Sequence, residues 1–374
     1  MPRSAPQTTE DDARLRAAVK PGDGFFTTFF VSSYSPHVVR AAARLGLTPN
    51  QVTVASMLVG ALAAAAFATG ERPGLIAGAV LLQVAFLLDC VDGQLARYTQ
   101  TFSPMGAWLD AVFDRTKEYL VYAGLAIGAA RTGDAVWLLA GAAMGLQTAR
   151  HAMDFSFSGQ NDASTSGVLA LARRHDTGPL SWAKRMVVLP IGERFAAISI
   201  TAAIWSAHTT FVVLLVWGGA AALYGFAGRA ARGRAAGATP AEKLRRYADH
   251  GPLAPLLRHV PISWAVPPLL RVVEYAAILS LVSIAGGNAY AGAFALVAAG
   301  AYRQYDLIYR ADDPPRWTGV VSLGWEGRVI ATAILVAAGA VPAGLYALAA
   351  AIGAVLVVQS VLSQTHDSQE AAAA

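Results

Sequence analysis

The chain has 374 residues, of which 55% are hydrophobic and only 14% charged, and its mean hydropathy is +0.45. A soluble domain usually carries about 25% charged residues, so this composition excludes an ordinary soluble protein and points to lipid as the main solvent. The formal net charge is +5, which lysine and arginine in cytoplasmic loops explain without a nucleic-acid partner, and a single cysteine excludes an intrachain disulfide framework.

The first predicted element is an interfacial helix at 35–45. In the stretch SPHVVRAAARL, Val39 and Ala42 share one helical face, whereas Arg40 and Arg44 lie on another. This pattern is typical of a helix that lies in the membrane surface. A plain polar cap on the first span is the alternative. Residues 1–20 are polar and mixed in charge, without the apolar stretch of a cleavable signal.

Apolar segments long enough to cross a bilayer, about 20 residues each, then recur along the chain. Six precede a polar, arginine-rich stretch and four follow it. We therefore predict an all-α polytopic membrane protein, with a six-helix core and about four further transmembrane helices. The expected spans are 51–69, 73–97, 105–129, 135–156, 190–207, 210–228, 263–285, 288–308, 327–340 and 342–362.

Charge gives the expected orientation and domain boundaries. With ten spans, nearly all lysine and arginine residues near the span ends fall on one side, which should be cytoplasmic. We expect a multi-pass protein of the cell membrane. The predicted domains are a polar N-terminal segment at 1–34, a core with its interfacial helix at 35–229, a cytoplasmic arginine-rich linker at 230–262, a C-terminal helical membrane module at 263–362 and a disordered tail at 363–374.

Four aspartates stand out in the segment LLDCVDGQLARYTQTFSPMGAWLDAVFD. Asp89 and Asp92 are three residues apart, and Asp110 and Asp114 are four apart, so each pair shares one helical face. The polar turn 99–104 should fold the two helices into an antiparallel hairpin. Both pairs then converge at the cytoplasmic end of that hairpin.

Four facing carboxylates repel one another and are costly in a membrane, so a strongly positive partner must neutralise them. Carboxylate oxygens without cysteine or clustered histidine select hard cations such as Mg²⁺, Mn²⁺ or Ca²⁺. We expect two ions, Mg²⁺ or Mn²⁺, about 3.5–4 Å apart, clamping a pyrophosphate. Ion pairing of the carboxylates with Arg97, Arg115 and Lys117 at the membrane edge is the structural alternative.

This segment resembles the full signature of the CDP-alcohol phosphotransferase family. The stretch TPNQVT at 48–53 also resembles the start of that family's first span. The six-span core of the family would cover about residues 20–230. The signature residues, with the family's spacing, are Asp89-x2-Asp92-Gly93-x2-Ala96-Arg97-x8-Gly106-x3-Asp110-x3-Asp114.

The resemblance implies a role for each of these residues. The activity would be transfer of a substituted phosphoryl group from a CDP-linked donor, CDP-diacylglycerol for example, to an alcohol, with release of CMP in phospholipid biosynthesis. Asp114 would act as the base that deprotonates the acceptor hydroxyl. The metals would be held by Asp89, Asp92, Asp110 and Asp114, and the CDP pocket would be lined by Gly93, Ala96, Arg97, Gly106, Pro49, Asn50 and Thr53.

A second polar set marks a candidate acceptor site. Guanidinium groups match phosphate oxygens in bidentate fashion, so these basic residues suit an acceptor that carries phosphate, such as inositol phosphate or glycerol phosphate. The alternative is that these residues are only part of the excess positive charge on the cytoplasmic side, particularly Lys184 and Arg185. The candidates are Arg150, Lys184, Arg185 and Arg194.

The C-terminal segment lies outside the family core and carries unusual charges for a membrane module. Arg271 and Glu274 are three residues apart on one predicted helix and should form an ion pair. This segment resembles, less strongly, an uncharacterised module fused to some of these transferases. We expect it to act in packing or dimerisation, and the protein to be a homodimer.

Two other classes of protein are compatible with acidic residues in a membrane. Intramembrane prenyltransferases use aspartate-rich motifs with Mg²⁺, but on helix pairs about a hundred residues apart, whereas these aspartates fall within one hairpin. A cation transporter would place acidic residues near the centres of several spans, in pseudo-symmetric halves. Metal-dependent release of CMP from a CDP-alcohol would distinguish a transferase from both.

Overall fold

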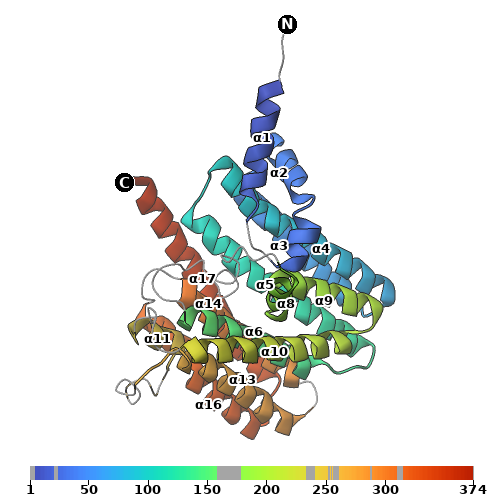
Figure 1. Cartoon of the computed structure of the whole chain (residues 1–374). Coiled ribbons are helices and arrows are strands. Elements are labelled where there is room, and N and C mark those ends of the chain that lie inside the picture. The colour runs from blue at the N-terminus through green and yellow to red at the C-terminus, as the bar shows by residue number, and fades with distance from the viewer. Residues whose placement is uncertain are drawn as a thin grey trace. The chain divides into compact units, whose positions relative to one another are not determined.

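The computed structural model describes residues 5–20, 24–157, 178–232, 241–251, 253, 255, 261–286, 289–309 and 315–373. Within these residues the secondary structure is helical and contains no strand, which confirms the prediction of an all-α fold (Figure 1).

Each of the ten expected spans corresponds to a helix. Among the described residues, six helical stretches are long and apolar enough to cross a membrane; they lie in α3, α4, α10, α13, α17 and at 317–337. α5 and α14 carry ionic side chains such as Lys117 and Arg303, which lower their hydropathy. The helices are α3 Pro49–Phe67, α4 Arg72–Thr99, α5 Pro104–Arg131, α6 Trp137–Phe157, α9 Ile191–Ile204, α10 Ala207–Arg232, α13 Val266–Ala285, α14 Ala289–Tyr309, α16 Gly324–Ala337 and α17 Ala343–Ala373.

Short helices complete the described part of the chain. The amphipathic α2 coincides with the interfacial helix expected at 35–45, and it buries Val39 and Ala42. α8 and α9 meet at a bend of 67°, so this pair forms a broken span or a re-entrant loop. The short helices are α1 Ala5–Ala18, the π-helix η1 Thr27–Val31, α2 Ser35–Arg44, α8 Pro179–Val187, α11 Ala241–Ala248 and α15 Arg316–Val321.

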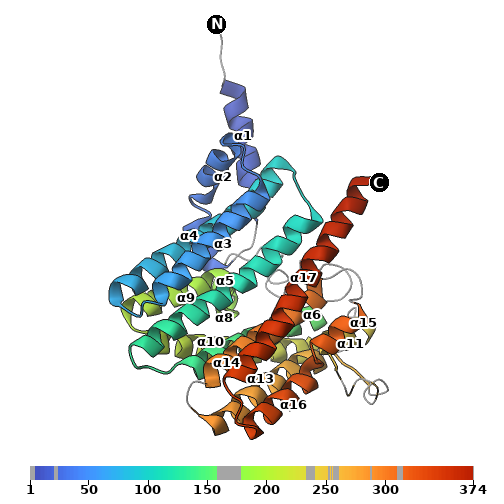
Figure 2. The same cartoon turned by 180° about the vertical axis from the view of Figure 1, so that it is seen from behind.

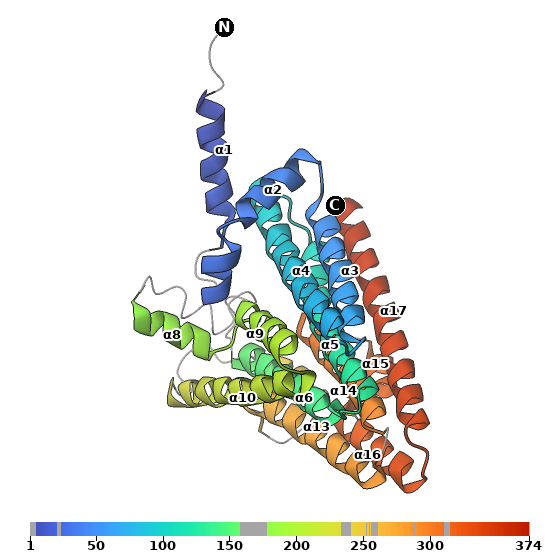
Figure 3. The same ribbon diagram turned by 90° about the vertical axis from the view of Figure 1, so that its right-hand side faces the viewer.

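The chain divides into two compact units, and the first comprises residues 1–134 and 168–210. In this unit α3 packs along both α4 and α5, and α4 also contacts α9, α2 and α1 (Figure 3). Gly124 and Gly128, one turn apart on α5, lie against the backbone of α3, where a Cβ would collide with the carbonyl oxygens of Ala64 and Phe67. Small residues at this spacing allow two membrane helices to approach closely.

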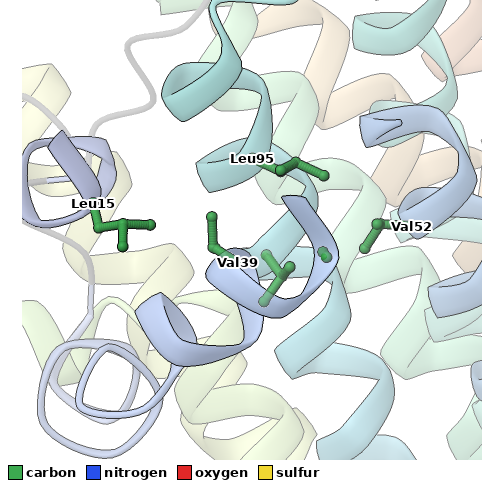
Figure 4. Close-up of a cluster of buried hydrophobic side chains, with 6 residues drawn as sticks. Leu15, Val39, Val52 and Leu95 are labelled. Atoms are coloured by element: carbon green, nitrogen blue, oxygen red, sulfur yellow. The ribbon is translucent and has the colours of Figure 1, made fainter. Parts of the chain in front are cut away.

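An apolar cluster fastens the N-terminal helices of this unit to α4. Leu15 of α1 points toward Val39 of α2, and Val52 and Leu95 close the cluster from α3 and α4 (Figure 4). All four side chains are buried. Removing this apolar surface from water holds α1 and α2 against the polar end of α4.

The second unit comprises residues 135–167 and 211–374. Here α6 packs against α13 and α14, and α14 packs against α17 (Figure 2). His151 of α6 contacts Tyr305 of α14, with 2.6 Å between Nδ1 and the hydroxyl oxygen. Gln147 approaches the other ring nitrogen at 2.7 Å, so both nitrogens of this histidine have partners.

The expected domain boundaries stay a prediction, since compactness groups the helices in another way. The expected core at 35–229 included α6 and α10, and α6 and most of α10 lie in the same compact unit as the C-terminal helices. The expected linker at 230–262 contains α11, whose Leu244 and Tyr247 are buried. The expected disordered tail at 363–374 continues α17 as helix to Ala373.

Candidate active site

The turn between α4 and α5 brings the two aspartate pairs together. Gln100 adopts a left-handed conformation with φ 58°, which ends α4, and Ser103 caps α5 by accepting a hydrogen bond from the amide of Gly106 at 2.9 Å. Carboxylate oxygens of Asp89, Asp92 and Asp110 then lie within 4.8 Å of one another. The structure therefore brings three of the four predicted metal ligands into one cluster, which we call the aspartate triad.

The N-terminus of α3 orients one member of this triad. Thr48 and Gln51 form a capping box, in which each side chain bonds the backbone amide of the other residue. This cap starts α3 so that Thr53 faces α4, and its hydroxyl donates to Oδ2 of Asp92 at 2.7 Å. The TPNQVT stretch therefore has two structural roles. It determines where α3 begins, and it orients the buried carboxylate of Asp92.

Asp114 has a different partner. Its Oδ1 lies 3.5 Å from the Nζ of Lys117, one turn further along α5. The same ammonium lies 2.5 Å from Oδ1 of Asp89. Lys117 is fully buried, and its ammonium forms ion pairs with both Asp89 of the triad and Asp114.

A cavity of about 360 Å³ opens beside the triad. Its wall contains two triad members, the buried Asp92 and the exposed Asp110. All seven residues expected to bind CDP line the same cavity. The wall consists of Pro49, Asn50, Thr53, Asp92, Gly93, Ala96, Arg97, Thr101, Phe102, Ser103, Gly106, Ala107 and Asp110.

Two glycines keep this cavity open. A Cβ on Gly106 would lie 2.7 Å from Oδ1 of Asn50, so any side chain there would displace a wall residue. A Cβ on Gly93 would lie 3.4 Å from Nη1 of Arg97, which is close to ordinary van der Waals contact. Arg97 itself is oriented by a hydrogen bond from its Nε to the carbonyl oxygen of Ala18, at 2.6 Å.

The four predicted acceptor residues do not share one environment. Arg194 is buried and donates from Nε and Nη2 to Glu118 at 2.6 and 2.9 Å. Arg185 is buried against the ring of Trp182, and Lys184 is exposed on the same helix, α8. Arg150 belongs to the second unit, where its Nη1 donates to Gln147.

Sequence reasoning named Lys117 only as an alternative ion-pair partner of the aspartates, which is the contact that the structure shows, and it missed Glu118. Both are fully buried in α5, and Glu118 pairs with Arg194 of α9. A signal was present, because charged residues three and four positions after Asp114 in an otherwise apolar helix must find partners. The cavity-wall residues Phe102 and Ser103 lie in the turn and carried no such signal.

Comparison with known proteins places this site in a family. The model of the CDP-alcohol phosphatidyltransferase family matches residues 46–222. The phosphatidylinositol phosphate synthase of Mycolicibacterium smegmatis is 32% identical over 182 residues, which are 48% of this chain and 76% of that protein. The chain belongs to the CDP-alcohol phosphatidyltransferase family. The signature at residues 89–114 was therefore identified correctly from the sequence.

The alignments with other relatives span a smaller part of this phosphatidyltransferase. The archaetidylinositol phosphate synthase of Pyrococcus horikoshii is 35% identical over 99 residues, 26% of this chain and 51% of that protein. The bifunctional IPC transferase and DIPP synthase of Rubrobacter xylanophilus is 42% identical over 83 residues, 22% of this chain and 18% of that protein. The chain thus spans about half or less of the length of these two relatives.

A second family model matches residues 165–374, a family of unknown function called DUF5941. This match covers the C-terminal module that the sequence separates from the phosphatidyltransferase core. It overlaps the first match at 165–222.

Proposed function

We propose that the protein transfers a substituted phosphoryl group from a CDP-linked donor to an alcohol acceptor and releases CMP. The observation that carries this proposal is the cavity beside the aspartate triad, because its wall combines triad carboxylates with every residue expected to bind CDP. The donor we propose is CDP-diacylglycerol. The acceptor we propose is a phosphorylated polyol, with inositol phosphate as the first candidate. The reason is that two relatives are named archaetidylinositol phosphate synthase and phosphatidylinositol phosphate synthase.

The aspartate triad fits a divalent cation. Its three carboxylates offer hard oxygen ligands within 4.8 Å of one another, which suits Mg²⁺ or Mn²⁺. Such an ion would supply positive charge that stabilises the charge developing on the phosphate oxygens. The sequence led us to expect two ions. A second ion held by Asp89 and Asp114 would lie close to the ammonium of Lys117, which already contacts the Oδ1 atoms of both carboxylates.

We propose separate roles for the residues that bind the donor and for the residue that accepts the proton. Arg97 and the backbone at Gly93 and Gly106 shape the cavity for the CDP moiety. We propose that Asp114 takes the proton of the acceptor hydroxyl as its oxygen attacks phosphorus. A new bond forms between that oxygen and the phosphorus, and the bond from the phosphorus to the CMP oxygen breaks.

We propose that the phosphate of the acceptor is bound by basic residues of the predicted acceptor set. Lys184 is exposed and its ammonium is accessible to a ligand, and Arg185 follows it on α8. The guanidinium of Arg194 already holds Glu118 in bidentate fashion, which favours a structural role for this residue. Arg150 lies in the second unit and is the least supported of the four.

The several apolar helices fit a multi-pass membrane protein. We further propose that the protein lies in the cell membrane with its active site facing the cytoplasm, because lysine and arginine gather near one set of span ends. We also propose that it works as a homodimer, in which the C-terminal module acts in packing or dimerisation.

The test is CMP release by the purified full chain in detergent or nanodiscs. CDP-diacylglycerol and soluble CDP-polyols would be combined with inositol phosphate, glycerol phosphate, serine and inositol, with Mg²⁺ or Mn²⁺ or with a chelator. We expect metal-dependent CMP release with one lipid donor and a phosphorylated polyol. Absence of CMP with every donor and acceptor pair would overturn the transferase proposal. CMP release with serine or inositol alone would overturn the proposed acceptor.

A further inference from the structure

Lys117 is the one buried lysine among the described residues that contacts the aspartate cluster. Its side chain is 0% exposed, and its ammonium has two carboxylate partners, Asp89 at 2.5 Å and Asp114 at 3.5 Å. The two partners come from different helices, α4 and α5. A charged amine in this place either neutralises the aspartates itself or competes with a metal ion for them.

The stem of Lys117 is packed against a neighbouring helix. The stem lies against Gly60 of α3, where an added Cβ would collide with Cγ of Lys117. A buried ammonium without a partner is very costly, so the side chain must remain beside its carboxylates. We therefore treat the ammonium as part of the site together with the aspartates that it contacts.

The position of the ammonium disfavours a second ion beside Asp89 and Asp114. One divalent ion at the triad requires oxygens of Asp89, Asp92 and Asp110. A second ion would draw on Asp114 and on a carboxylate of the triad, and paired ions stand about 3.5–4 Å apart. The Oδ1 atoms of Asp89 and Asp114 already face Lys117, so that second ion would lie directly against a fixed positive charge.

We propose that Lys117 replaces the second metal ion in this protein. The chain then binds one divalent cation at the aspartate triad, and the ammonium of Lys117 holds Asp89 and Asp114 in place. Lys117 is a positioning residue in this account, because it acts through the two carboxylates. The inference rests on the metal-binding triad of the proposed function, and its test separates the two.

The experiment measures the number of Mn²⁺ ions bound per chain by equilibrium dialysis of the purified full chain, together with the electron paramagnetic resonance spectrum of the bound Mn²⁺. We expect one ion in the wild type, with the spectrum of an isolated Mn²⁺. Lys117→Met, which keeps the length of the side chain but removes its charge, should bind two ions and show spin–spin coupling. Lys117→Arg, which keeps the charge, should bind one.

The matched control is Lys243→Met, at an exposed lysine of α11, which should leave the count at one. Two ions in the wild type would overturn the inference, and so would a single ion in a folded Lys117→Met variant. The wild-type count alone tests the inference if that variant does not fold. No bound ion in the wild type would instead refute the metal site of the proposed function.

Discussion

Arg97 donates a hydrogen bond from its Nε to the carbonyl oxygen of Ala18, and this bond connects the cavity wall to the C-terminal end of α1. The last carbonyls of a helix lack partners within the helix, so a guanidinium satisfies one of them well. Arg14 adds a second bond, from Nη2 to the carbonyl oxygen of Tyr98 at 3.3 Å. α1 therefore orients a residue of the proposed CDP pocket.

This relationship predicts that loosening α1 weakens donor binding. Leu15→Asp places a charge in the apolar cluster that holds α1 to α2 and α4. We expect KM for the CDP donor to rise roughly tenfold, the scale of about 1.4 kcal/mol, with a smaller change in kcat. Ala13→Asp, at an exposed position of the same helix, is the control. An unchanged KM in a folded Leu15→Asp protein would count against this role of α1.

The aspartate triad predicts loss of transfer in its alanine variants. Asp89→Ala, Asp92→Ala or Asp110→Ala each removes one of three carboxylates that lie within 4.8 Å of one another. We expect CMP release to become undetectable while the protein still inserts in the membrane, as measured by detergent extraction and size-exclusion chromatography. Activity within about threefold of the wild type, less than about 0.7 kcal/mol in barrier, would refute the assignment for that residue.

Gly106 predicts a steric effect on the cavity. Gly106→Leu places its Cβ 2.7 Å from Oδ1 of Asn50, and the rest of the side chain enters the cavity. We expect loss of CMP release without loss of expression. Gly219→Leu is the control, because a Cβ at this helical position in α10 meets nothing within 4 Å. An active Gly106→Leu enzyme with the wild-type KM would show that the donor does not use this cavity.

Asp114→Asn separates proton transfer from binding. The amide keeps the size of the carboxylate but cannot accept the proton of the acceptor, and general-base catalysis contributes about 10²–10⁴-fold. We expect turnover to fall by that factor, with donor affinity changed less than about tenfold. Mn²⁺ occupancy measured on the same variant must remain at the wild-type value. With normal occupancy, a fall in turnover of less than tenfold would assign the base to another group.

The second unit holds a buried charge network that predicts a stability effect. Asp249 accepts hydrogen bonds from Arg328 at 2.8 Å and Arg303 at 3.3 Å, and Arg271 lies 3.8 Å away. Asp249→Asn removes the negative charge that these three buried guanidinium groups share. Breaking a buried ion pair typically costs about 3–5 kcal/mol. We expect a large fall in thermal stability, measured by fluorescence of the detergent-solubilised protein, whereas Glu242→Gln at an exposed site of α11 should have little effect.

The same carboxylate predicts how this stability depends on pH. Burial alone would raise the pKa of Asp249, but the guanidinium groups of Arg328, Arg303 and Arg271 outweigh it and hold the pKa below the ordinary value of 3.8. A group with a lowered folded pKa stabilises the protein above its unfolded pKa, and the contribution is lost as the pH falls through the folded pKa. We therefore expect the wild-type advantage over Asp249→Asn to be constant above about pH 5 and to shrink below about pH 4. An advantage that grows on acidification would contradict this assignment.

Local patterns in the sequence account for the parts of the site that depend on one helix. The spacing of Asp89 and Asp92 predicted that both lie on one face of α4, and the triad bears out that they converge with Asp110. The spacing of Arg271 and Glu274 likewise predicted their ion pair, which has 2.7 Å between Nη1 and Oε2. Helical periodicity determines such contacts, so the chain alone reveals them.

Contacts between distant elements could not be predicted in this way. Asp249 follows α11 in a stretch that appeared to be an arginine-rich linker, yet its partners come from α13, α14 and α16. The pairing of Arg194 with Glu118 joins residues 76 positions apart, and nothing in the sequence indicated that this predicted phosphate ligand has a carboxylate partner. Each of these contacts depends on which helix faces which, and no local pattern carries that information.

The placement of α6 has a consequence for how the protein is made. α6 packs on α13 through Gly141 and Gly145, which lie against Leu279 and Tyr275. Its partner α13 begins about 110 residues after α6 ends, and ribosomes add about 5–20 residues per second. For several seconds, then, α6 is in the membrane before the helix that covers it has left the ribosome. Lipid or another helix must occupy that face during this interval, and the second unit can finish folding only after α17 has been synthesised.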